Sequence, residues 1–155
     1  MEIDLSLVGS FSEPFEVEVE KCEIRKFAMA IGDRNPLYFD EAYARGKGYA
    51  GLLAPPTYPT CFRPPLVPVW MRGLDQRRIV AGQMAFTYEK PITAGMRLTC
   101  RMHFAGVDDK QGAKGRMQII RQALQGHDKT GELVFVAARN TVYRSLEQVE
   151  RRSLA

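Results

Sequence analysis

The sequence of 155 residues lacks a long apolar run, and it is poor in cysteine and histidine, with three cysteines and two histidines. No stretch reaches the roughly 18 apolar residues that a membrane-spanning helix needs. The N-terminus is acidic, with Glu2 and Asp4 where a signal peptide would be basic. We therefore expect a cytoplasmic protein that is not inserted in a membrane. Low-complexity tracts and internal repeats are also lacking, which favours a single globular domain.

The three cysteines, Cys22, Cys61 and Cys100, lie far apart and form no CxxC pair. An odd, scattered set argues against a disulfide framework and against a zinc site. We expect three reduced, largely buried side chains and no bound metal. The net charge of +4 suits a phosphate-bearing ligand or an acidic carrier protein but requires neither. Since no basic run is interleaved with aromatic residues, we do not expect nucleic-acid binding.

The first half of the chain changes its hydrophobic period near Lys21. Residues 15–20 alternate between apolar and acidic side chains, which predicts a half-buried strand. Apolar residues then recur at helical spacing, which predicts an amphipathic helix from about Lys21 to Ile31 that ends at Gly32. Asp33 follows this helix end in a turn stiffened by Asn35-Pro36.

The middle of the chain is rich in proline. Asp40 is expected to cap a short helix over residues 41–45. Six prolines then fall within residues 55–68. Such density excludes a long regular helix, so we expect only a turn or two after Pro56 and another near residues 69–74.

From Ile79 onward the period is two, which predicts four antiparallel strands in a meander. The first strand is expected to place Val80, Gly82, Met84, Phe86 and Tyr88 on one face. Three further strands are expected near residues 97–104, 116–124 and 133–143, with a hairpin tip at residues 108–112 and turns at residues 91–95 and 126–131. The last eleven residues, 145–155, are polar and read as a loose tail. One strand, then helices, then a sheet is an α+β pattern.

Three blocks in order resemble the MaoC-like hydratase/dehydratase family, and its N-terminal-half type in particular. They are Ala30-Ile31-Gly32-Asp33-Arg34-Asn35-Pro36-Leu37-Tyr38, Ala54-Pro55-Pro56-Thr57, and Gly82-Gln83 with Lys90-Pro91-Ile92 to Gly95. The resemblance implies a hot-dog fold over residues 1–144, in which a curved antiparallel sheet wraps a central helix, here broken. It also implies a homodimer, or a heterodimer with a catalytic MaoC-like subunit. The ligand would be an acyl thioester of coenzyme A or acyl carrier protein, with no other cofactor.

The family adds water to an enoyl thioester or removes it, which takes a carboxylate and an imidazole near one water and a backbone N–H that polarises the thioester carbonyl. By resemblance the carboxylate is Asp33, while Tyr38 stands where active members have histidine. Tyrosine, with a pKa near 10, is a poor base at neutral pH. Pro55 falls near the expected N–H donor and has none to give.

The remaining candidate site residues each have a structural alternative. Asn35 either holds the turn or touches ligand. Pro55, Pro56, Thr57 and Tyr58 either shape a pocket mouth or form a rigid corner over the sheet. The aspartate itself is either an acid–base group or a turn residue bonded to nearby amides. Arginines near Trp70 either meet carrier phosphates or lie solvated on the surface, and these are Arg63, Arg72, Arg77 and Arg78.

Three functions follow from the resemblance. The first is an enoyl-thioester hydratase or 3-hydroxyacyl-thioester dehydratase of fatty acid metabolism, with Asp33 activating water and Tyr38 assisting. The second is a non-catalytic, acyl-binding subunit whose partner supplies the Asp/His pair. The third, a hot-dog thioesterase, is weaker because the Gly-Asp-x-Asn-Pro segment is a hydratase mark.

Overall fold

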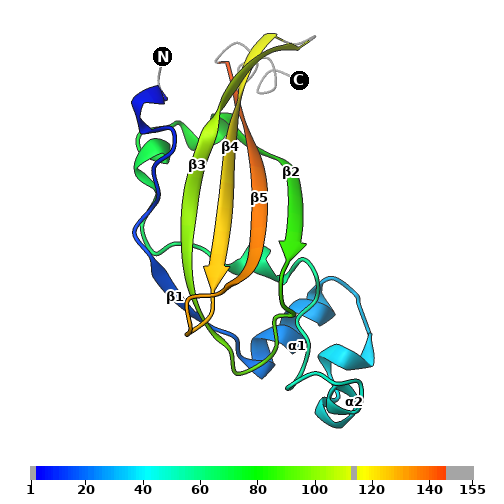
Figure 1. The fold of residues 1–155 in the computed structure, drawn as a ribbon. Helices are drawn as coiled ribbons and strands as arrows, with labels where there is room; N and C mark the ends of the chain where they lie inside the picture. The colour runs from blue at the N-terminus through cyan, green and yellow to red at the C-terminus, as the bar shows by residue number, and fades with distance from the viewer. Residues whose placement is uncertain (1–2, 113–114, 146–155) are drawn as a thin grey trace.

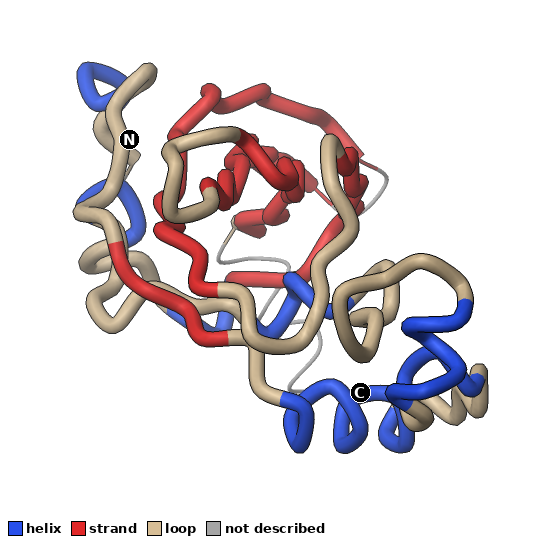
Figure 2. Tube along the Cα trace, turned by 60° about the horizontal axis from the view of Figure 1, so that its bottom comes forward, coloured by secondary structure: helices blue, strands red, loops and turns tan. Residues whose placement is uncertain are grey.

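A computed structural model of the chain describes residues 3–112 and 115–145. Five antiparallel strands form one sheet in the order β1-β3-β4-β5-β2. The sheet curves strongly along its length, and the two α-helices lie at one end of it (Figures 1 and 2). The strands are β1 (Phe15–Glu18), β2 (Ile79–Tyr88), β3 (Arg97–Gly112), β4 (Gly115–His127) and β5 (Leu133–Arg144).

Two α-helices form where the sequence predicts them. Helix α1 (Lys21–Ala30) buries Ile24 and Ala28 against the core. Helix α2 (Glu41–Gly46) is capped by Asp40, whose side chain accepts a hydrogen bond from the Tyr43 amide. Among the described residues, no helix combines the length and apolar character needed to cross a membrane.

The sheet departs from a simple meander at β2. Strands β3, β4 and β5 follow one another, but β2 pairs with β5 and lies at the sheet edge. A bulge between Ala81 and Met84 also changes which face the strand presents. Ala81 and Met84 line one cavity, while Val80 is exposed, so the predicted grouping of Val80 with Met84 is wrong. Gly82 is needed here because a Cβ would lie 2.6 Å from the Asn140 carbonyl oxygen.

The central hairpin is longer than predicted. Residues 108–112 belong to β3 and pair with β4 as far as Gly112 opposite Gly115, so they are not the hairpin tip. Strand β4 likewise continues through Gly126 to His127. An ion pair between Arg116 and Asp109, 3.0 Å apart, joins the strands where polar sequence suggested a turn.

Residues 55–78, which we call the proline-rich segment, cover one face of the sheet and lie behind it in the view of Figure 1. The segment forms only short 3₁₀ turns, Tyr58–Cys61, Val69–Met71 and Gln76–Arg78, in place of a continuous central helix. Two further 3₁₀ turns are Leu5–Leu7 and Pro36–Tyr38. Aromatic contacts fix the segment to the sheet: the Trp70 ring stacks on Phe104 with centroids 5.3 Å apart, and Phe62 meets Phe135 edge to face.

The expectation that the cysteines are buried holds for one of the three. Cys100 is buried, and burial raises its pKa to about 12. Cys22 and Cys61 are free but exposed, so the expectation of burial is wrong for both.

The assignment of residues 1–144 to one domain stays a prediction. The predicted tail lies, beyond Ser145, outside the described residues.

Candidate functional site

Asp33 occupies a turn that the end of α1 defines. Gly32 takes a left-handed conformation with φ of +72° and donates its amide to the Met29 carbonyl. The Asp33 amide reaches the Ala28 carbonyl at 3.0 Å, which completes a Schellman C-cap. One carboxylate oxygen of Asp33 accepts a hydrogen bond from the Asn35 amide at 3.0 Å. The aspartate therefore makes the Asx turn of the structural alternative.

Tyr38 lies close to this carboxylate. Its side chain is 5% exposed. Burial raises the pKa of Tyr38, the charge of Asp33 raises it further, and a hydrogen bond with the Asn35 side chain lowers it. The structure thus brings together Asp33, Asn35 and Tyr38. With its pKa raised, Tyr38 is protonated at neutral pH and can donate a hydrogen bond but cannot act as a base.

The step at residues 54–56 offers no amide for a ligand. The Ala54 N–H donates to the Ile92 carbonyl at 2.8 Å, and Pro55 and Pro56 have no N–H. Pro56 lines a cavity of about 340 Å³ together with Tyr49, Leu53 and Tyr88. The Tyr88 hydroxyl donates to the Pro56 carbonyl at 2.5 Å, which holds this corner in place.

Thr57 and Tyr58, the next two candidate residues, differ in their exposure to solvent. Thr57 is exposed. Tyr58 packs into the core between Phe27 and Phe62, and burial raises its pKa to about 12. Pro55 is also buried. A ligand-binding role for these three residues stays a prediction.

Neither histidine belongs to this turn. His103 lies on β3 and stacks on Phe11 with ring centroids 4.6 Å apart. His127 ends β4 opposite Thr99. Within residues 3–112 and 115–145, no group of three metal-ligating side chains comes together.

A larger cavity lies between the proline-rich segment and the sheet, and we call it the sheet groove. Its volume is about 530 Å³. Much of its lining is apolar, contributed by Val67, Met71, Ile79, Met84 and Met102, and the three methionines are flexible. No local sequence pattern marks this groove, because its residues come from the proline-rich segment and four different strands.

A buried polar relay forms part of the groove wall. The Trp70 indole N–H donates to Gln122 Oε1 at 2.8 Å, and Gln122 Nε2 donates to the Thr141 hydroxyl at 3.3 Å. Gln122 and Thr141 are both buried and line the groove. The relay therefore ties the proline-rich segment to β4 and β5.

Two arginines also line the groove, Arg63 and Arg139. Burial lowers the pKa of Arg139, and the charge of Arg63 lowers it further. Only Arg63 was among the sequence candidates. The signal for Arg139 was its position on β5, two residues from Ala137 and from Thr141, where strand alternation predicts the buried face.

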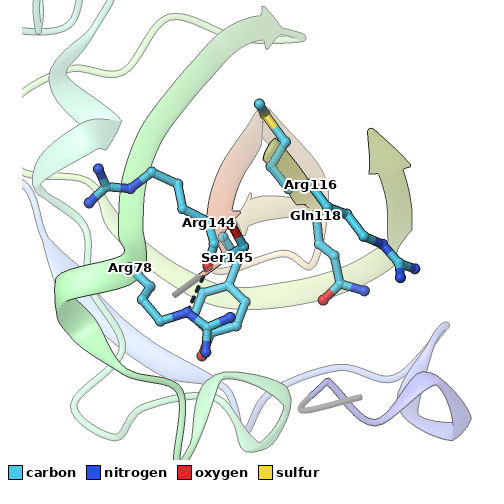
Figure 3. Close-up of a pocket in the computed structure, with 7 residues that line it drawn as sticks. Arg78, Arg116, Gln118, Arg144 and Ser145 are labelled. Carbon is cyan, nitrogen blue, oxygen red and sulfur yellow. Dashed lines mark hydrogen bonds between the residues drawn. The ribbon is translucent and has the colours of Figure 1, made fainter. Parts of the chain in front are cut away.

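A third pocket, of about 340 Å³, lies where β2 begins and β5 ends (Figure 3). Its arginines already have partners. Arg78 donates to the Arg144 carbonyl at 2.7 Å, the bond drawn in Figure 3, and its guanidinium lies over the Tyr143 ring at 4.1 Å. Arg116 pairs with Asp109. We therefore regard this pocket as a structural junction of strand ends. The remaining candidates, Arg72 and Arg77, are exposed and bond to Val67 and Asp75.

Fold and site together define a class. A curved antiparallel sheet whose face is covered by a proline-broken segment, with a Gly-Asp-x-Asn-Pro turn beside it, is the hot-dog fold of MaoC-like dehydratases. A family model described as "FAS1-like, dehydratase domain region" matches residues 6–137. The chain belongs to this family, which confirms the resemblance drawn from the sequence.

Similarities to individual relatives and to solved structures support this assignment. The chain is 36% identical over 155 residues to a UPF0336 protein of Streptomyces avermitilis, covering 96% of this chain and 99% of the relative. Its structure is similar to the HadBC (3R-hydroxyacyl-ACP dehydratase) complex of Mycobacterium tuberculosis, with a TM-score of 0.74, 26% identity and coverage of 92% and 99%. The fold also matches a MaoC-like dehydratase of Rhodospirillum rubrum, with a TM-score of 0.65, 21% identity and coverage of 89% and 93%.

Proposed function

We propose that this chain is the acyl-thioester-binding subunit of a two-subunit hydratase/dehydratase. The partner subunit supplies the Asp/His pair, and this chain holds the acyl group in the sheet groove. The carrier is coenzyme A or acyl carrier protein, with no further cofactor. The observation that carries the proposal is a protonated, buried Tyr38 beside Asp33, combined with a large apolar groove on the sheet.

The chemistry supports a divided role. Hydration needs a group that accepts a proton from water near neutral pH, and imidazole does this well. Tyr38 does not, because both burial and the Asp33 charge raise its pKa. The carbonyl-polarising N–H is also missing at residues 54–56, where one amide is already bonded and two residues are proline.

The groove supports acyl binding. A volume of about 530 Å³ is within the range of about 300–1,000 Å³ typical of small-molecule sites. Methionine side chains adapt to chains of varied shape, and Met71, Met84 and Met102 all line it. An acyl chain placed there would contact these apolar side chains.

The sheet edge supports a partner. Strand β2 is an edge strand, and its exposed residues include Val80, Ala81 and Ala85. Long apolar edges are normally covered, since they offer unpaired backbone groups to other chains. The structurally similar HadBC protein is a complex of two different subunits. We propose that a catalytic MaoC-like subunit pairs along β2.

A second candidate function keeps the chemistry in this chain. The Asp33 carboxylate lies close enough to Tyr38 to raise its pKa. In this version Asp33 activates the water, and the neutral Tyr38 hydroxyl donates to the thioester carbonyl. It differs from the first proposal in requiring turnover without a partner.

Loss of enoyl-thioester absorbance, measured with the purified chain alone, separates the two. Binding of saturated acyl thioesters is measured in parallel by calorimetry. We expect binding without turnover, and turnover once a catalytic MaoC-like subunit is added. Asp33→Asn is compared with Asp109→Asn, a matched change on β3. Turnover by the chain alone that only Asp33→Asn abolishes would replace the subunit proposal with the enzyme. Absence of acyl-thioester binding would refute both.

A further inference from the structure

Arg139 stands on the buried face of a core strand. Strand side chains alternate between faces, and Phe135, Ala137, Thr141 and Tyr143 are all buried, with exposed fractions of 0, 1, 6 and 2%. Arg139 continues this series. Its cross-strand neighbours are Gln122 on β4 and Met84 on β2, and all three side chains line the sheet groove.

No acidic side chain of the described residues balances this charge. Among the described residues that line the groove, Arg63 and Arg139 are the only charged side chains. Neither forms an ion pair in the part of the chain that the structure describes. The two positive charges repel each other instead. Burial lowers the pKa of Arg139, and the charge of Arg63 lowers it further. A half-buried cation without a counter-ion is costly, and a bound anion relieves that cost.

The groove combines this charge with an apolar wall. Met71, Ile79 and Met102 offer a surface suited to methylene groups. No aromatic ring lines the described part of the groove, so a nucleotide base would find nothing to stack on. A ligand that satisfies both features has an apolar body and a negative group within reach of Arg139 and Arg63.

We infer that the sheet groove selects acyl groups that carry a carboxylate on the acyl chain, held by Arg139 with help from Arg63. The inference rests on the proposed function and narrows its substrate class to acidic acyl chains. An arginine guanidinium can bind a carboxylate through two parallel hydrogen bonds, which fixes its position as well as its charge. A plain alkyl chain would leave the half-buried Arg139 without a partner, whereas Arg63 is exposed to solvent.

The test uses pantetheine thioesters, which lack the phosphates of coenzyme A. Three probes of equal length are compared by calorimetry with the full chain: a plain acyl, an ω-carboxyacyl and the ω-methyl ester of the latter. We expect the carboxylate to bind at least about tenfold more tightly than its methyl ester. Arg139→Met should abolish this preference and leave plain acyl binding intact. Arg139→Lys should keep part of it, and Arg63→Met should reduce it.

Arg97→Met is the matched control, because Arg97 is exposed on β3 and faces Glu18. It should leave the preference unchanged. Equal binding of all three probes would overturn the inference while the proposed function stands. If none binds, the proposed function itself fails. Coenzyme A that competes through Arg139 would assign the arginines to carrier phosphates and overturn the inference. So would an Arg139→Met variant that weakens only association with a catalytic subunit. The wild-type comparison of carboxylate with ester holds whether or not a variant folds.

Discussion

Removing both members of the Trp70–Gln122 hydrogen bond should cost less stability than the sum of the two single removals. The indole N–H and Gln122 Oε1 lie 2.8 Å apart, and both side chains are buried. Gln122→Met leaves the indole N–H without an acceptor. Trp70→Phe leaves Gln122 Oε1 without a donor. In the double variant neither orphaned group remains, because both partners are apolar.

The magnitudes follow from the cost of an orphaned polar group. Each single change should lower the free energy of unfolding by about 1–3 kcal/mol, since a buried group loses its partner without gaining water. Trp70→Phe adds about 1 kcal/mol for the void left beside Phe104. The double variant keeps the void, and like Gln122→Met it deprives the Thr141 hydroxyl of its donor, but it orphans neither the indole N–H nor Gln122 Oε1. Its destabilisation should therefore fall short of the sum of the singles by both orphan costs, about 2–6 kcal/mol.

The assay is urea unfolding followed by far-UV circular dichroism, because Trp70 is the single tryptophan and its fluorescence is lost in two of the variants. Each kcal/mol corresponds to about 2–4 °C in Tm for a chain of this size. Trp70→Phe combined with Gln111→Met, an exposed change at the end of β3, should be additive. If Trp70→Phe with Gln122→Met were additive to within about 0.5 kcal/mol, the hydrogen bond would not be the link we describe.

Three further predictions concern other positions. Gly126→Ala places a Cβ 2.1 Å from Phe135 Cε1 and should destabilise by about 1–3 kcal/mol in thermal unfolding; an unchanged Tm would mean that the ring can shift. Gly32→Ala meets no neighbouring atom but must adopt φ of +72°, so it should cost about 1 kcal/mol, and Gly32→Asn should cost less. Lys90→Met removes the first cause that lowers the pKa of Asp128. A lowered folded-state pKa stabilises in full above the unfolded value of about 3.9 and progressively less as the pH falls toward the folded value. The Tm deficit of Lys90→Met should therefore be full at pH 7 and shrink below about pH 4; a pH-independent deficit would contradict this.

Local features were predictable from the sequence. The end of α1, the Asx turn at Asp33 and the cap at Asp40 depend on residues within five positions of each other. Their geometry therefore follows from side-chain and backbone preferences alone. The juxtaposition of Asp33, Asn35 and Tyr38 was predictable for the same reason, since one turn carries all three.

Features set by pairing between distant segments were not predictable. The bulge at Gly82 depends on the approach of Asn140, almost sixty positions away, and it reverses the face of half a strand. The hairpin at residues 108–112 reads as a turn because it is polar, but pairing with β4 keeps it extended. The groove was missed because it joins distant segments, although the place of Arg139 in the alternation of β5 was visible in the sequence.

The proline-rich segment is the physical origin of the groove. Its prolines exclude a helix whose apolar stripe would fill the face of the sheet. The segment is instead fixed at two points, by Phe62 against Phe135 and by Trp70 against Phe104 and Gln122. Between these points Leu66 is exposed, and the residues that line the groove are Arg63, Pro64, Pro65, Val67 and Pro68. Because both ends are held by buried contacts, the groove exists before any ligand arrives, so binding requires little reorganisation. The Asp33 turn belongs to a separate element at the end of α1. A change of acid–base residue at position 38 therefore leaves the groove intact, which is the physical condition for the division of labour that we propose.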